Sequence, residues 1–151
     1  MKIEETFSVN APVDQVWEFM MDPDRMAPCV PGCSDVEVLG ENKYRANVKV
    51  AVGPIKTSFK VSVELTEQNA PTYAASVTRG EEGGKASMLT ANSELRLTSV
   101  NSEETEVYYL SEVSLVGRLG KFGLGMMKKK AKAIGEEFAE SFRTQIETPG
   151  Q

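Results

Sequence analysis

The chain has 151 residues, which is long enough for one domain with a hydrophobic core and too short for two comfortable ones. Its net charge of -5 argues against a nucleic-acid binder, because a field of that sign repels phosphates, while 40% apolar and 26% charged residues are ordinary for a globular protein. The absence of histidine removes the usual general base of serine and cysteine nucleophiles and the commonest zinc ligand, which disfavours an enzyme and a metal site.

The sequence carries no pattern for membrane insertion or export. No apolar run approaches the roughly eighteen residues that a transmembrane helix needs. The N-terminal stretch MKIEETFSV lacks the apolar core of a signal peptide, so we expect a cytoplasmic protein.

The N-terminal segment is predicted to form one strand and two short helices. Residues 3, 5, 7 and 9 share one face of an alternating segment, which is typical of a strand. In NAPVDQVWEFMMDP, the apolar residues from Val13 to Met20 follow the stripe of an amphipathic helix. Asp22-Pro23 ends this helix, because the residue before proline is pushed out of the helical region, and a second short helix is expected near residues 23–27.

Two cysteines follow, Cys29 and Cys33, in a proline-constrained turn. Their C-x3-C spacing differs from the C-x2-C of zinc knuckles and thioredoxin-like pairs, and no second ligand pair accompanies them. Two partly buried thiols are the favoured interpretation, and a reversible disulfide is the alternative that a reducing cytoplasm disfavours.

The segment from residue 34 to residue 116 is predicted to form six antiparallel strands. Alternating runs such as NKYRANVKVAV and IKTSFKVSVELTE are separated by the turn signals ENK, NAPT, GEEGG and NSEE. Short strands joined by tight turns indicate a meander with one solvated face.

From about Leu119 onward, apolar residues recur at steps of three or four up to Ile146. This pattern predicts one amphipathic helix of about 27 residues, about 40 Å long at 1.5 Å per residue. A sheet and a helix that each have one apolar face must bury those faces against each other. We therefore expect a single α+β domain over residues 1–148, in which the long C-terminal helix crosses the concave face of a curved seven-stranded antiparallel sheet. Residues 149–151 are expected to form a short tail.

The stretch VGRLGKFGLGMMKKK joins the last predicted strand to this helix. It is not a P-loop, because Gly120-Lys121 is followed by Phe122 and not by serine or threonine, and its glycines do not form G-x-G-x-x-G. We expect a tight reversal at Gly117 and Gly120. Because glycine weakens a helix, the first turn with Gly123 and Gly125 is a candidate gate, so replacing both with alanine is expected to slow ligand exchange.

Basic residues are concentrated around this junction. The window holds six of them and no acidic residue, on a chain that is acidic as a whole. A solvated helix face is one interpretation, and a contact patch for anionic lipid heads or an acidic partner protein is the other. The predicted patch consists of Arg118, Lys121, Lys128, Lys129, Lys130 and Lys132.

The order of these elements, with NAPVDQVWEFMMDP near the front, resembles the START/Bet v 1-like (SRPBCC) helix-grip superfamily. Three stretches are similar to CoxG, the family of the G subunit of carbon monoxide dehydrogenase: Pro31-Gly32-Cys33, VGPIKTSFKVSVEL and VSLVGRLGKFG. The resemblance covers roughly residues 2 to 147.

The resemblance implies a cavity between helix and sheet that takes an apolar small molecule such as a quinone or a lipid. It also implies association with a molybdenum-containing carbon monoxide dehydrogenase or a related hydroxylase. Recruitment of that enzyme to the inner face of the membrane, as a peripheral contact with anionic lipid, is a further implication. No covalent cofactor and no nucleic-acid partner are expected.

Three functions remain open at the level of sequence. The leading hypothesis is a non-catalytic carrier or adaptor that holds a lipophilic molecule in the cavity. An enzyme of the polyketide-cyclase or hydrolase type is the main alternative, with Tyr109, Ser111 and Ser93 as the inward-facing polar candidates, and a ligand-free assembly factor is the third. The predicted cavity residues are Met20, Val61, Val63, Leu89, Tyr109, Val113, Leu115, Phe122, Met126 and Ile134.

Overall fold

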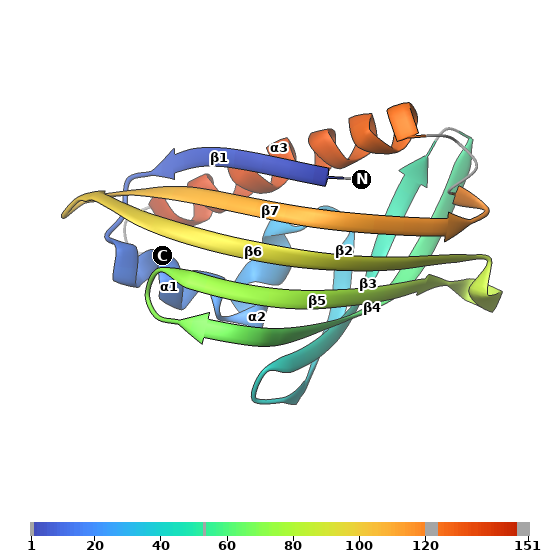
Figure 1. The fold of residues 1–151 in the computed structure, drawn as a ribbon, viewed down its shortest axis with the longest axis horizontal. Coiled ribbons are helices and arrows are strands. Elements are labelled where there is room, and N and C mark those ends of the chain that lie inside the picture. The colour runs from blue at the N-terminus through green and yellow to red at the C-terminus, as the bar shows by residue number, and fades with distance from the viewer. Residues whose placement is uncertain (1, 53, 120–123, 148–151) are drawn as a thin grey trace.

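The structure, a computed structural model, describes residues 2–52, 54–119 and 124–147 (Figure 1). Its elements follow the predicted order of one strand, short helices, six strands and a long helix. They are β1 (Lys2–Val9), α1 (Val13–Met20), α2 (Pro23–Met26), the 3-10 turn η1 (Ala27–Cys29), β2 (Cys33–Gly40), β3 (Lys43–Val52), β4 (Ile55–Asn69), β5 (Tyr73–Glu82), the 3-10 turn η2 (Gly83–Lys85), β6 (Ser87–Asn101), β7 (Glu104–Gly117) and α3 (Leu124–Glu147).

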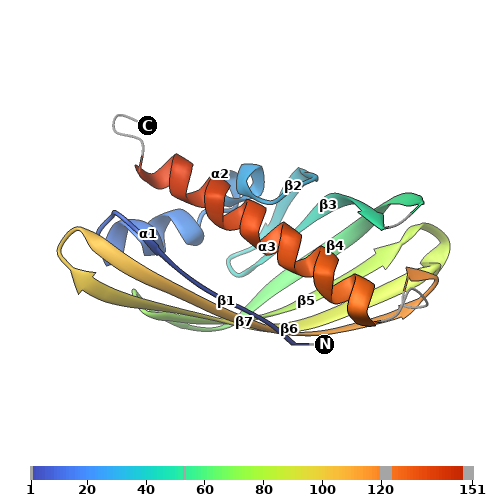
Figure 2. The ribbon, with the colours of Figure 1, turned by 90° about the horizontal axis from the view of Figure 1, so that it is seen from above.

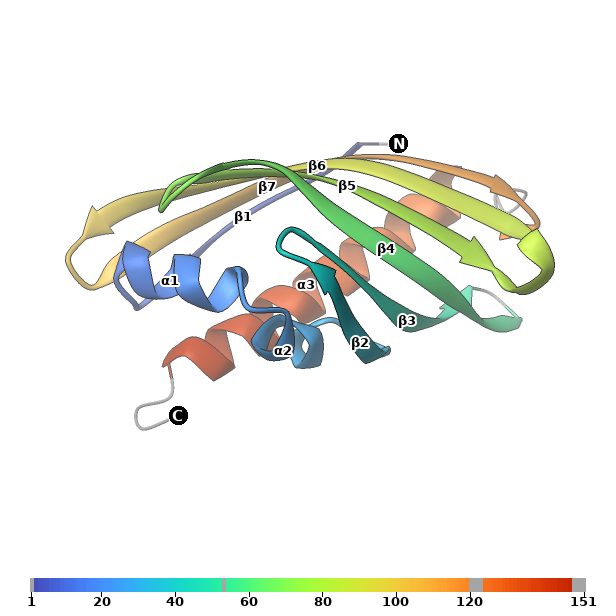
Figure 3. The same ribbon diagram turned by 90° about the horizontal axis from the view of Figure 1, so that it is seen from below.

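The seven strands form one antiparallel sheet in the order β1-β7-β6-β5-β4-β3-β2. The sheet is curved, and α3 crosses its concave side diagonally (Figure 2). The short helices α1 and α2 lie on the same side of the sheet as α3 (Figure 3). The prediction of an α+β helix-grip fold is confirmed.

The pairing of β5, β6 and β7 decides which side chains meet on the concave face. Ser76 lies opposite Ser93, which lies opposite Ser111, so three serines form one row across the sheet. In the adjacent row, Leu95 lies opposite Tyr109. Because side chains alternate along a strand, these two rows face the same side, toward α3.

The long helix begins later than the sequence pattern predicts. Residue Leu119, which we expected near the helix start, precedes α3 and is buried, with 1% of its surface exposed. Its backbone N–H donates a hydrogen bond to Ser87 Oγ at 3.0 Å, so it belongs to the packing of the sheet end. Residues 120–123, with the expected Gly120 turn and Gly123 helix residue, lie outside the described residues.

Gly117 confirms the tight reversal that was expected at the end of the last strand. Its φ is +96°, a conformation that only glycine adopts readily. A Cβ atom at this position would lie 2.3 Å from the Ala86 carbonyl oxygen. No side chain therefore fits at Gly117.

The buried core consists of two separate clusters. The larger cluster joins α1, the C-terminal half of α3 and the neighbouring ends of β1, β6 and β7. The smaller cluster consists of Val52, Phe59 and Leu119, with Met127 of α3 packed against it. The C-terminal half of α3 is thus fastened to a large core, whereas its N-terminal half rests on a small one.

Candidate functional site

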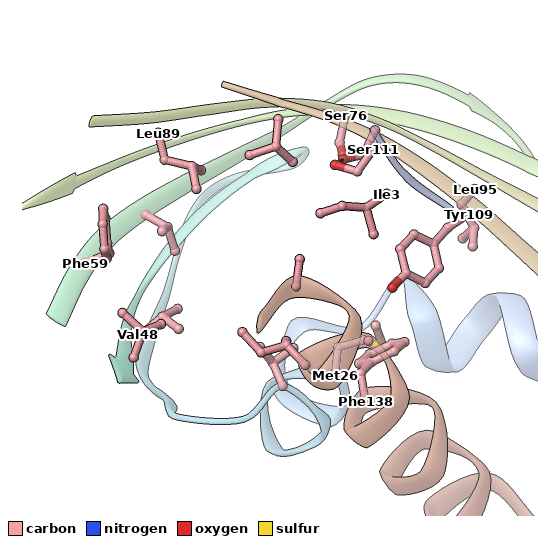
Figure 4. Close-up of a pocket in the computed structure, with 18 of the residues that line it drawn as sticks. Ile3, Met26, Val48, Phe59, Ser76, Leu89, Leu95, Tyr109, Ser111 and Phe138 are labelled. Atoms are coloured by element: carbon pink, nitrogen blue, oxygen red, sulfur yellow. Dashed lines mark hydrogen bonds between the residues drawn. The ribbon is translucent and has the colours of Figure 1, made fainter. Parts of the chain in front are cut away.

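A cavity of about 530 Å³ lies between the concave face of the sheet and α3. Figure 4 shows side chains from the strands, from the α2 segment and from α3 pointing into it. Members of both core clusters contribute to its wall, and almost all of that wall is apolar. The apolar lining includes Met20, Met21, Met26, Val48, Val50, Val61, Leu89, Leu95, Val113, Leu115, Met127, Ile134 and Phe138.

Methionines are concentrated at this cavity. Four of them, Met20, Met21, Met26 and Met127, line its wall. Methionine is unbranched and polarizable, so it adapts to apolar ligands of varied shape. This composition is suited to a flexible hydrophobic guest.

The cavity has one polar band in an otherwise apolar lining. Ser76, Ser93 and Ser111 line it, in the row that crosses β5, β6 and β7. Ser93 Oγ and Ser111 Oγ form a hydrogen bond of 2.9 Å. A pair of hydroxyls uses one proton for this bond, which leaves the other O–H free to donate.

Tyr109 is the next inward residue on β7, and Glu5 of β1 lies opposite it in the sheet. Burial, helped by the negative charge of Glu5, raises the pKa of the Tyr109 phenol to about 12. The hydroxyl is therefore protonated at neutral pH and is available as a hydrogen-bond donor.

The structure places seven of the predicted cavity residues in the wall: Met20, Val61, Leu89, Tyr109, Val113, Leu115 and Ile134. Val63 has the inward parity of its strand but is not among the lining residues. Met126 is 44% exposed and points away from the cavity wall, which its neighbour Met127 lines instead. Phe122 lies outside the described residues. Whether these residues bind a ligand stays a prediction.

Sequence reasoning missed the β3 wall of the cavity and one residue of α3. Tyr44, Val48 and Val50 alternate along β3, so strand parity alone could have identified them. Gly135 of α3 also lines the cavity, and no sequence signal distinguishes it from other helix glycines.

The predicted basic patch is divided by the structure. Arg118 forms an ion pair with Glu82, a carboxylate that is 2% exposed and also accepts a hydrogen bond from Ser87 Oγ at 2.9 Å. Hydrogen bonds from Arg118 and Thr57 lower the pKa of Glu82 to about 2, against the opposing effect of burial. Arg118 therefore has a structural role, because it holds the end of β7 next to β5.

The lysines of α3 also separate into two groups. Lys128, Lys129 and Lys132 are exposed, whereas Lys130 is half-buried and lines the cavity. None of these four lysines has an ion-pair partner within residues 2–52, 54–119 and 124–147. Lys121 lies outside the described residues. Among the helices that the structure describes, none has the length and apolar character to cross a membrane.

Cys29 and Cys33 are free thiols, as the favoured interpretation predicted. Cys29 is buried and Cys33 is half-buried, and burial raises the pKa of both thiols. A thiol with a raised pKa is a poor nucleophile at neutral pH.

The polar side chains needed by the enzyme alternative do meet in the cavity. Tyr109, Ser111 and Ser93 line it together, as inward parity predicted. However, the cavity holds no histidine, and the serine hydroxyls bond to each other rather than to a base. An unactivated serine is a weak nucleophile, so this geometry fits binding better than catalysis.

Comparison with known proteins identifies the fold and the family. A conserved protein from Geobacillus kaustophilus matches with a TM-score of 0.89 and 25% identity, over 97% of this chain and 95% of that chain. A START superfamily protein from Mycobacterium smegmatis matches with a TM-score of 0.79 and 13% identity over 97% of both chains. The ZhuI aromatase/cyclase from Streptomyces sp. R1128 matches with a TM-score of 0.63 and 19% identity, over 97% of this chain and 90% of that chain. No protein with a curated description matches the sequence.

The structural matches agree with the predicted superfamily, and a family model narrows the assignment. The model for CoxG, the G subunit of carbon monoxide dehydrogenase, matches residues 6–147. A START-like fold with an internal cavity and this family suggest a ligand-binding or carrier protein. The chain belongs to the CoxG family.

Proposed function

We propose that the protein is a non-catalytic carrier or adaptor that holds a lipophilic small molecule, quinone-like or lipid-like, beneath α3. The observation that carries this proposal is the apolar cavity of about 530 Å³ that separates α3 from the sheet. A closed core would have filled this space with side chains, since protein interiors are normally close-packed.

The size and chemistry of the cavity are sufficient for useful affinity. Burying ten methylene groups at about 0.8 kcal/mol each contributes about 8 kcal/mol before the costs of association. The methionines of the wall allow the tail to be bent or straight. A non-covalently held guest therefore fits the site, with no metal required.

The family suggests where such a carrier would act. The CoxG description names a subunit of carbon monoxide dehydrogenase, so we propose association with a molybdenum-containing enzyme of that type. Exposed Lys128, Lys129 and Lys132 are then proposed to contact anionic lipid, with the exposed Met126 beside them on α3. The proposed location is the cytoplasmic face of the membrane, as a peripheral contact.

The carrier proposal predicts that freshly purified protein contains an apolar molecule. Native mass spectrometry is expected to show a mass above that of the 151-residue chain, and solvent extraction is expected to release the additional component. Protein that is unfolded, extracted and refolded should bind the released molecule again. A chain that carries nothing and does not rebind the extract of its own host cells would contradict the proposal.

The membrane proposal predicts salt-sensitive binding to anionic vesicles. A lysine near an anionic surface contributes about 1 kcal/mol, so replacing Lys128, Lys129 and Lys132 with glutamine should weaken sedimentation with phosphatidylserine vesicles about 100-fold. Replacing the exposed Lys43, Lys56 and Lys60 of β3 and β4 with glutamine changes the net charge equally and is the matched control. Equal losses in the two triple variants, or equal binding to neutral vesicles, would count against the patch.

A further inference from the structure

The hydroxyl of Tyr109 is a polar group without a protein partner inside an apolar cavity. The ring projects from β7 and its oxygen points toward α3 (Figure 4). Within residues 2–52, 54–119 and 124–147 this hydroxyl makes no hydrogen bond, whereas the adjacent Tyr108 bonds to Glu4 on the other face of the sheet. A hydroxyl that is withdrawn from bulk water without a partner is costly, so a guest that bonds to it gains affinity.

Gly135 makes the space that this hydroxyl occupies. A Cβ atom on Gly135 would lie 2.7 Å from Tyr109 Oη, closer than such atoms pack in proteins. Glycine inside a helix costs about 0.5–1 kcal/mol relative to alanine, so the helix loses stability at this position. In return, the phenol reaches the level of the α3 backbone and stands at the centre of the cavity wall.

The surrounding charges select the kind of guest. Glu5 lies opposite Tyr109 in the sheet, and its negative charge disfavours an anionic group at the hydroxyl. The nearest cavity neighbours of Tyr109 on the concave face, Leu95 and Ser111, are uncharged. A neutral hydrogen-bond acceptor is therefore favoured at this position over a carboxylate or a phosphate.

We propose that Tyr109 donates a hydrogen bond to a carbonyl oxygen of a neutral, mainly apolar ligand. The free O–H of the Ser93–Ser111 pair, about 7 Å away along β7, is a second contact for a polar atom of the same molecule. This inference rests on the proposed carrier function and narrows it to carbonyl-bearing guests. Tyr109 is thus a residue that determines ligand specificity.

The test uses two probes of nearly the same shape, benzophenone and diphenylmethane, which differ in one carbonyl group. Their affinities are measured by displacement of the uncharged fluorophore N-phenyl-1-naphthylamine. Tyr109→Phe is expected to lower the affinity for benzophenone relative to diphenylmethane about fivefold, the effect of one typical hydrogen bond. Tyr108→Phe removes a hydroxyl from the opposite face of the sheet and should leave the ratio unchanged.

A spectroscopic measurement separates a direct hydrogen bond from a general change in the fold. The infrared carbonyl stretch of benzophenone bound to the wild-type protein is expected at lower frequency than in Tyr109→Phe, because donation weakens the C=O bond. Gly135→Ala should reduce the shift by displacing the phenol, whereas Gly125→Ala, whose Cβ meets nothing within 4 Å, should not.

The outcomes distinguish this inference from the proposed function. If both probes bind and their affinity ratio is the same in wild type and Tyr109→Phe, the carbonyl assignment is wrong while the carrier function stands. If neither probe nor the fluorophore binds to the wild-type protein, the carrier function fails and the assignment fails with it. A fivefold change in the ratio, together with the infrared shift, supports both.

Discussion

Filling the cavity with Ala131→Trp is expected to abolish binding of an apolar ligand while the protein stays folded. Ala131 is half-buried on α3 and lines the cavity, so an indole at this position occupies the space that the guest needs. We expect at least a tenfold loss of affinity for N-phenyl-1-naphthylamine, measured by fluorescence titration. The additional apolar surface has space available, so the usual cost of overpacking, about 1–3 kcal/mol, should be largely avoided.

The matched control for this variant is Ala133→Trp on the same helix. Ala133 is exposed, so the same residue change adds the same side chain without entering the cavity. Its affinity for the fluorophore should equal that of the wild-type protein. If Ala131→Trp binds as tightly as Ala133→Trp, the ligand does not occupy the space between α3 and the sheet.

The largest loss of stability is expected from Phe142→Ala. Phe142 is fully buried and its ring lies 5.0 Å from that of Phe19 and 6.1 Å from that of Phe7, in edge-on arrangements, and 5.9 Å from that of Phe138. Removing a buried phenyl ring destabilises a protein by about 3–5 kcal/mol, because it leaves a cavity as well as losing buried surface. Urea denaturation followed by circular dichroism would measure the change in the free energy of unfolding.

Two comparisons place this result in context. Met126→Ala removes a large side chain from the same helix, but Met126 is 44% exposed, so its loss should cost less than about 1 kcal/mol. A similar cost for Phe142→Ala would contradict the view that the C-terminal half of α3 is fastened to the larger core. The predicted difference reflects how α3 is held, firmly at its C-terminal half and weakly at the cavity.

This asymmetry also concerns the gate that the sequence suggests. Gly125 lies in the first turn of α3, and a Cβ atom added to it would have no neighbour within 4 Å, so alanine fits there without strain. Its partner in that hypothesis, Gly123, lies outside the described residues. Slower ligand exchange after replacing both glycines stays a prediction.

The sequence by itself determined the architecture and the direction of most side chains. Strand alternation and the helical stripe predicted the element order, and the alternation on β6 and β7 identified Leu89, Val113 and Leu115 as inward-facing residues that the structure places in the cavity wall. These patterns are local, since they depend on the geometry of one strand or helix. Family resemblance added the expectation of a cavity, which no periodic pattern contains.

Only the tertiary structure decided that the inward face encloses open space. Periodicity tells which way a side chain points, but the distance to the opposite layer depends on how α3 is held above the sheet. The same limit applies to Arg118, which sequence reasoning placed in a surface patch and which the fold pairs with the buried Glu82. It applies equally to Gly135, since its close approach to Tyr109 joins residues 26 positions apart through the packing of a helix on a sheet.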